Sequence, residues 1–120
     1  MVAGLLVLLV TGCSGAAEQE AGAAAAAFAA DPAAACDRLA PDTARALAEE
    51  GTDCGEALAG FSGGDAAVLQ VEVAGESAFV RLADQVVFLA RFPQGWLVTA
   101  AGCVREDTDP AVPYECEVQP

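Results

Sequence analysis

The spacing of hydrophobic residues changes near residue 65, and this change limits the chain to one class of fold. Residues 21–61 are rich in alanine and contain prolines at positions typical of helix starts. From Val68 onward, hydrophobic and polar residues alternate, as in VLQVEVA over 68–74, which is typical of half-buried strands. Helices followed by a run of strands predict an α+β domain in which N-terminal helices pack on one face of an antiparallel sheet.

Proline, glycine and acidic residues mark the ends of the expected helices. Asp31 and Pro32 are suited to the first positions of a helix, and Gly51 is suited to the left-handed residue that ends one. Asp53 and Glu56 have the spacing of a capping box, which starts another short helix. We therefore expect helices over 22–30, 32–39, 41–50 and 54–58.

A glycine-rich turn over 62–65 precedes the expected meander of four strands. These strands are expected over 68–74, 77–82, 85–92 and 96–104. The third strand has apolar residues on both faces. One face is expected to pack against the helices, so the other face also has to be covered. That second face consists of either Val86 and Phe88 or Val87 and Leu89. A dimer partner, the C-terminal tail or a bound apolar molecule could cover it.

An apolar run ends at Cys13, and it has the length of the hydrophobic region of a signal peptide rather than of a membrane span. The sequence VTGC at 10–13 resembles the lipobox of bacterial lipoproteins. The resemblance implies that residues 1–12 are a signal peptide and that Cys13 carries the lipid, including palmitate-like acyl chains. Residues 13–22, small and acidic without an apolar period, are expected to be a tether before the domain at 23–120.

The basic segment that normally opens a signal peptide is missing, because neither Lys nor Arg precedes the apolar run. We therefore expect the natural start codon to lie upstream.

Four further cysteines follow Cys13 in the sequence. Export would place them in an oxidising compartment, where four cysteines most simply form two disulfides. Of the three pairings, we expect Cys36–Cys54 and Cys103–Cys116, because each closes a local loop within one half of the chain. A four-thiolate metal site is the alternative, but no two of these cysteines form a CxxC pair. We therefore expect no metal.

The order of motifs also resembles a known family. The segments AFAADPAAACDRLAPDTARAL, VEVAGESAFVRL and FLARFPQGWLVTAAGC resemble small secreted lipoproteins of high-GC Gram-positive bacteria. Those proteins are in turn similar to the nuclear-transport-factor-like superfamily, whose curved sheet forms a cone around N-terminal helices. The resemblance implies that aromatic residues either line a ligand pocket in the cone or fill it as core, and we expect core. They are Phe28, Phe61, Phe79, Phe88 and Trp96.

Charge and composition exclude several classes of function. A net charge of −13 opposes binding to nucleic acid, and the absence of histidine excludes Ser-His-Asp, Cys-His and histidine-based zinc sites. The superfamily includes ketosteroid isomerase, which needs a tyrosine, a protonated carboxylic acid and an aspartate base. Here the only tyrosine, Tyr114, lies in a proline-flanked tail with no base aligned to it. We expect no catalytic residues and no cofactor.

These observations together predict a lipoprotein anchored through Cys13 on the extracytoplasmic face of the cell membrane. Its domain is expected to act as a non-catalytic binding module at the cell envelope, offering an acidic face to a protein partner. The alternative is a carrier or sensor of a small apolar ligand in the cone, and an isomerase-like enzyme is the third hypothesis. A homodimer is one way of covering the sheet.

Overall fold

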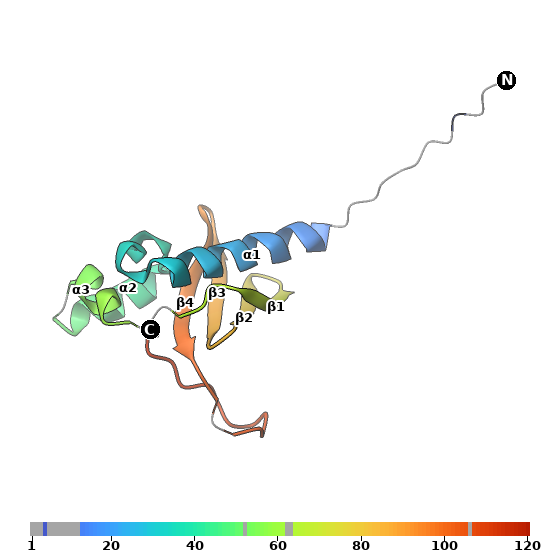
Figure 1. The fold of residues 1–120 in the computed structure, drawn as a ribbon. Coiled ribbons are helices and arrows are strands. Elements are labelled where there is room, and N and C mark those ends of the chain that lie inside the picture. The colour runs from blue at the N-terminus through green and yellow to red at the C-terminus, as the bar shows by residue number, and fades with distance from the viewer. Residues whose placement is uncertain (1–3, 5–12, 52, 62–63, 106) are drawn as a thin grey trace.

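The computed structural model describes residues 4, 13–51, 53–61, 64–105 and 107–120. The segment expected to be a signal peptide therefore lies outside the described residues apart from Gly4. Helices precede a four-stranded antiparallel sheet in the order β1-β2-β3-β4, which confirms the α+β class (Figure 1). Within the described ranges, no helix has the length and the apolar character needed to span a membrane.

The sheet is a meander whose bounds agree closely with the predicted strands. They are β1 (Val68–Ala74), β2 (Ser77–Leu82), β3 (Val86–Phe92) and β4 (Gly95–Cys103). Gly75 and Gly95 have positive φ angles of 60° and 122° in the turns, which a residue without Cβ adopts readily. Neighbouring strands are antiparallel, with Val80 opposite Val87 and Leu89 opposite Val98, and the β3–β4 pairing has register shifts between Val86 and Leu89.

Helix α1 (Cys13–Ala30) lies across one face of this sheet, contacts all four strands and is longer than expected (Figure 1). The prediction of a tether over 13–22 and a first helix over 22–30 was wrong about where the helix begins. Ala17, Ala21 and Ala25 recur every four residues on the buried side, and alanine favours helix strongly. Small residues also let the helix approach the sheet: a methyl group on Gly22 would lie 3.2 Å from Cγ2 of Val71.

The segment after α1 forms two short 3₁₀ helices, η1 (Pro32–Ala34) and η2 (Cys36–Arg38), rather than the predicted α-helix. The chain has to be extended again by Leu39, which forms a parallel bridge with Val98 of β4. Ala40 is extended too, as is usual before proline, and its N–H donates to the Val98 carbonyl at 2.8 Å. The chain therefore makes two short 3₁₀ turns before it becomes extended at Leu39.

Two further helices follow, α2 (Pro41–Glu49) and α3 (Cys54–Ala59), close to the predicted positions. Helix α2 buries Thr43 and Leu47, whereas Ala48 is exposed. Gly51 has the expected positive φ, 77°. Asp53 precedes α3 as expected, but its side chain makes no capping hydrogen bond.

The two faces of β3 have different covers. Val87 and Leu89 face the helices, where they join a core that includes Phe28. On the opposite face, the ring of Tyr114 lies edge-on to Phe88 at a centroid distance of 5.6 Å. The C-terminal tail is therefore the part of the chain that covers the second face.

Candidate functional site

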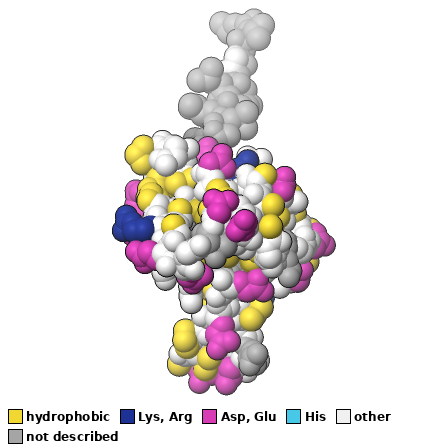
Figure 2. Space-filling view, turned by 90° about the vertical axis from the view of Figure 1, so that its left-hand side faces the viewer, with side chains coloured by type: hydrophobic (Ala, Val, Ile, Leu, Met, Phe, Trp, Pro, Cys, Tyr) yellow, Lys and Arg dark blue, Asp and Glu magenta, His cyan; other side chains and the backbone are white. Residues whose placement is uncertain are grey.

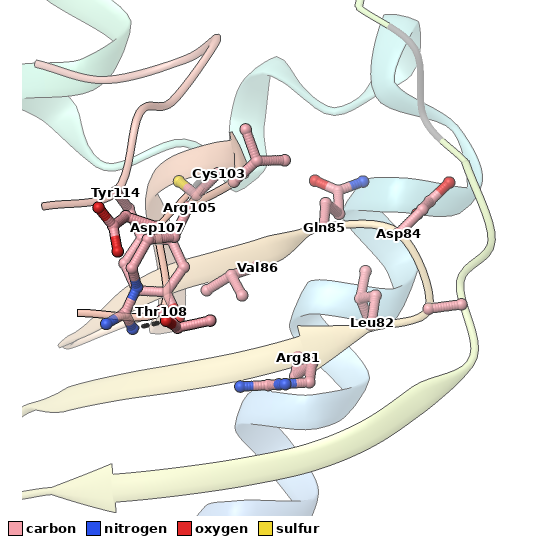
Figure 3. Close-up of a pocket in the computed structure, with 12 residues that line it drawn as sticks. Arg81, Leu82, Asp84, Gln85, Val86, Cys103, Arg105, Asp107, Thr108 and Tyr114 are labelled. Atoms are coloured by element: carbon pink, nitrogen blue, oxygen red, sulfur yellow. Dashed lines mark hydrogen bonds between the residues drawn. The ribbon is translucent and has the colours of Figure 1, made fainter. Parts of the chain in front are cut away.

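A groove of about 510 Å³ opens where the turn between β2 and β3 meets the chain that follows β4 (Figure 3). Val86 and Cys103 contribute apolar surface, and Arg81, Arg105 and Tyr114 contribute polar and aromatic groups. This groove is the largest of the described hollows. A volume of this size is in the range of small-molecule sites.

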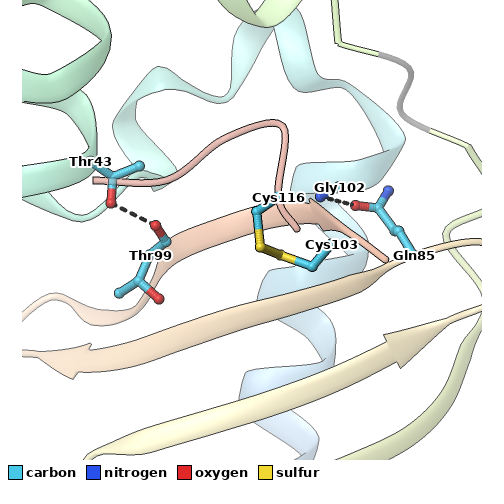
Figure 4. Close-up of a disulfide and its surroundings, with 6 residues drawn as sticks. All are labelled: Thr43, Gln85, Thr99, Gly102, Cys103 and Cys116. Atoms are coloured by element: carbon cyan, nitrogen blue, oxygen red, sulfur yellow. Dashed lines mark hydrogen bonds between the residues drawn. A yellow bond between two sulfur atoms is a disulfide. The ribbon is translucent and has the colours of Figure 1, made fainter. Parts of the chain in front are cut away.

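The wall of the groove formed by residues 104–105 and 107–116 is fastened to the sheet by a disulfide and by backbone hydrogen bonds. The disulfide Cys103–Cys116 joins the end of β4 to the tail (Figure 4). Val104 and Glu115 exchange two backbone hydrogen bonds of 2.9 Å. The tail residues of the groove are therefore held against the strands.

The floor of the groove is fixed by a buried side chain. The Gln85 side chain is 7 % exposed, and its Oε1 accepts the Gly102 N–H at 2.8 Å (Figure 4). Gly102 has φ of 65°, and a methyl group there would lie 2.6 Å from Cε2 of Phe61. The positive φ and the close approach of Phe61 to the end of β4 thus require glycine at this position.

The side chain of Arg105 is held in place by Tyr114. One guanidinium nitrogen donates a hydrogen bond of 2.8 Å to the Tyr114 hydroxyl, and the guanidinium lies 4.3 Å from the ring centroid. The Tyr114 ring packs edge-on to Phe79 and Phe88, at 6.1 and 5.6 Å. The two phenylalanine rings hold the Tyr114 ring, and Tyr114 in turn holds the Arg105 guanidinium. The guanidinium is therefore oriented without a ligand.

Both arginines of the groove lack a carboxylate partner in the part of the chain that the structure describes. The one ion pair there joins Arg45 to Asp42 at 3.3 Å on α2. Two carboxylates, those of Asp84 and Asp107, also line the groove. Asp107 Oδ1 already accepts the backbone N–H of Asp109 at 2.9 Å.

The five aromatic residues considered as pocket lining do not surround one common cavity. Phe28 and Phe61 pack on each other at 5.7 Å on the helix side of the sheet. Phe79 and Phe88 pair at 5.6 Å on the opposite side. Trp96 is buried beside α1, with the Arg91 guanidinium 4.8 Å from its ring centroid, and it lines a separate hollow of about 310 Å³.

The cysteines pair as predicted, Cys36 with Cys54 and Cys103 with Cys116. Cys13 begins α1. Among the described residues, no three His, Cys, Asp or Glu side chains are grouped in a way that could hold a metal ion.

Three residues of the groove had no sequence signal strong enough to single them out. Arg81 lies between two buried residues of β2, and this alternation indicates only that its side chain points away from the core. Arg105 and Gln85 lie in segments without a motif, and Gln85 meets Gly102 only in the folded chain.

The chain matches no protein-family model, and neither the curated proteins nor the solved structures include a significant match to it.

Proposed function

We propose that this protein is a lipoprotein, anchored through Cys13 to the extracytoplasmic face of the cell membrane, whose domain is a non-catalytic binding module. The pairing of the cysteines carries the proposal. Four of them form two disulfides, which persist in oxidising compartments, and the fifth stands directly after the lipobox-like sequence. A cysteine that carries lipid cannot also form a disulfide, so the count of one plus four fits an exported lipoprotein.

Binding at the surface is favoured over a ligand inside the domain. The space between α1 and the sheet is filled by large buried side chains, among them Phe28, Leu58, Leu82 and Leu89. A carrier of an apolar ligand would need that space to be empty. The groove at the edge of the sheet is open to solvent instead.

The surroundings of the tyrosine favour binding over isomerase-like catalysis. The Tyr114 hydroxyl accepts a hydrogen bond from Arg105 and lies on the face of the sheet opposite the helices. An isomerase of the cone type uses its tyrosine as a donor inside an apolar pocket.

The acidic surface is compatible with a role at the cell envelope and opposes binding to nucleic acid. Figure 2 shows Asp and Glu side chains spread over one face of the molecule, with basic side chains sparse among them. With a net charge of −13, the domain is repelled by phosphate backbones and by anionic head groups. A covalent lipid, rather than a charged surface, is then the means of holding it at the membrane.

The anchor is tested by comparing the wild-type protein with Cys13→Ala, both expressed from the natural gene in the source organism. Wild type is expected in the membrane fraction, with the mass of a diacylglycerol and acyl chains added at Cys13. Cys13→Ala is expected to leave that fraction. Ser14→Ala, one residue further on, is the matched control and is expected to behave as wild type. Equal membrane retention of Cys13→Ala and wild type would overturn the proposal.

A further inference from the structure

We propose that the groove between Arg81 and Arg105 binds a small amphiphilic anion, with its carboxylate or phosphate group on the arginines and its apolar body on Val86 and Tyr114. The inference rests on the proposed role as a binding module and gives the chemical class of the ligand. In Figure 3 the Arg81 side chain is directed toward the end of the groove where Arg105 and Tyr114 lie.

Arginine geometry supports an oxygen anion as the ligand. A guanidinium presents five N–H donors in a planar fork that matches carboxylate and phosphate oxygens. Tyr114 accepts a hydrogen bond from one of the Arg105 nitrogens, and its ring centroid lies 4.3 Å from the guanidinium carbon, so the direction of the other donors is restricted. Because this side chain is already ordered, less conformational entropy is lost when a ligand binds.

The charge distribution supports the same ligand. In a chain with 18 acidic and five basic residues, two of the basic side chains line one groove. Neither forms an ion pair within the described ranges. Asp84 and Asp107 oppose a bound anion, and Figure 3 places Asp84 at the far end of the groove from Arg105. Of the two carboxylates, that of Asp107 lies nearer to Arg105 and repels an anion bound there more strongly.

The apolar surface of the groove accounts for the second half of the ligand. Val86 is 6 % exposed and Val104 is 48 % exposed, and both line the groove beside the Tyr114 ring. A volume of about 510 Å³ accommodates one aromatic or short aliphatic group with its head group. A bare inorganic anion would leave this surface in contact with water.

The test uses the full lipoprotein in nonionic detergent and three probes of one shape: benzoate, phenyl phosphate and neutral benzamide. Amide NMR shifts report the binding site. We expect benzoate or phenyl phosphate to shift groove residues such as Val86 and Cys103 saturably, with benzamide at least about tenfold weaker. A carboxylate ligand favours benzoate, and a phosphate ligand favours phenyl phosphate. Inorganic phosphate, which lacks the apolar body, is expected to bind more weakly than phenyl phosphate.

Variants locate the interaction. Arg81→Gln and Arg105→Gln are each expected to weaken binding by about tenfold, because each removes charged donors. Arg38→Gln makes the same charge change on the exposed helix η2 and is expected to bind as wild type. Asp107→Asn is expected to tighten binding, since it removes the nearer opposing charge.

Benzamide binding as tight as benzoate, or equal losses in Arg38→Gln and Arg81→Gln, would overturn the inference, and so would the absence of saturable shifts with either anion. The comparison of the three probes on the wild-type protein decides the matter even if a variant does not fold. Failure here leaves the membrane fractionation of Cys13→Ala unaffected, so the two proposals fail separately.

Discussion

The hydroxyl of Thr43 donates a 2.8 Å hydrogen bond to the carbonyl oxygen of Thr99, although the two residues are 56 positions apart in the sequence (Figure 4). Thr43 is fully buried on α2, and Thr99 lies in β4. This bond joins the helical half of the chain to the last strand.

Replacing Thr43 with valine is expected to lower the free energy of unfolding by about 1–3 kcal/mol, because the partly buried Thr99 carbonyl loses its donor while the side chain at position 43 keeps its shape. Urea unfolding measures the change. Thr43→Ser is the control, because it keeps the hydroxyl and loses one methyl group, at a cost of about 0.8 kcal/mol. A valine variant as stable as the serine variant would show that the hydrogen bond contributes little.

Gly102→Ala is expected to destabilise the protein through two effects. Its φ of 65° costs an L-residue about 1–2 kcal/mol, and the new methyl group would meet Phe61 at 2.6 Å, adding about 1–3 kcal/mol of overpacking. Gly75→Ala is a matched control, because Gly75 has a similar φ of 60° but no atom within 4 Å of the added methyl. Thermal unfolding of both variants separates the terms. Equal losses would mean that Phe61 moves aside without cost.

The strands could be predicted from sequence because their signals are local. Alternation over 68–74 indicated the first strand, and glycines marked the turns at Gly75 and Gly95. The disulfides were predictable for the same reason, since each closes a short loop. Local patterns of this kind depend little on the rest of the fold.

The first half of α1 and the segment 32–39 could not be predicted in this way. In α1 the buried stripe before Phe28 consists of alanines, which are equally common on exposed helix faces, so the period was not apparent. In 32–39 the conformation depends on the bridge from Leu39 to Val98, a partner nearly 60 residues away. The groove could not be predicted for the same reason, because Arg81, Gln85 and Arg105 are brought together only by the folded sheet and the tail.

Removing the disulfide Cys103–Cys116 with a double serine variant is expected to cost about 3 kcal/mol and to loosen the wall of the groove. The tail then depends on the backbone pairing of Val104 with Glu115 and on the Tyr114 ring. Limited proteolysis is expected to cleave 105–115 faster than in wild type. The disulfide Cys36–Cys54 closes a loop of similar length, so its double serine variant is expected to lose similar stability without faster cleavage of 105–115. Equal cleavage in both variants would mean that the disulfide does not hold the tail.

Phe28 and Phe79 pack on opposite faces of the sheet and differ in burial. Replacing each with alanine is therefore expected to lower the free energy of unfolding by different amounts. Phe28 is fully buried between α1 and the sheet, so Phe28→Ala is expected to lower the free energy of unfolding by about 3–5 kcal/mol. Phe79 is half-buried under Tyr114, and part of its ring already contacts solvent, so Phe79→Ala is expected to cost clearly less. Chemical denaturation of the two variants measures the difference. If Phe28 lined an empty pocket, its removal would cost no more than that of Phe79, because a ring that borders a void has already lost part of its packing contacts.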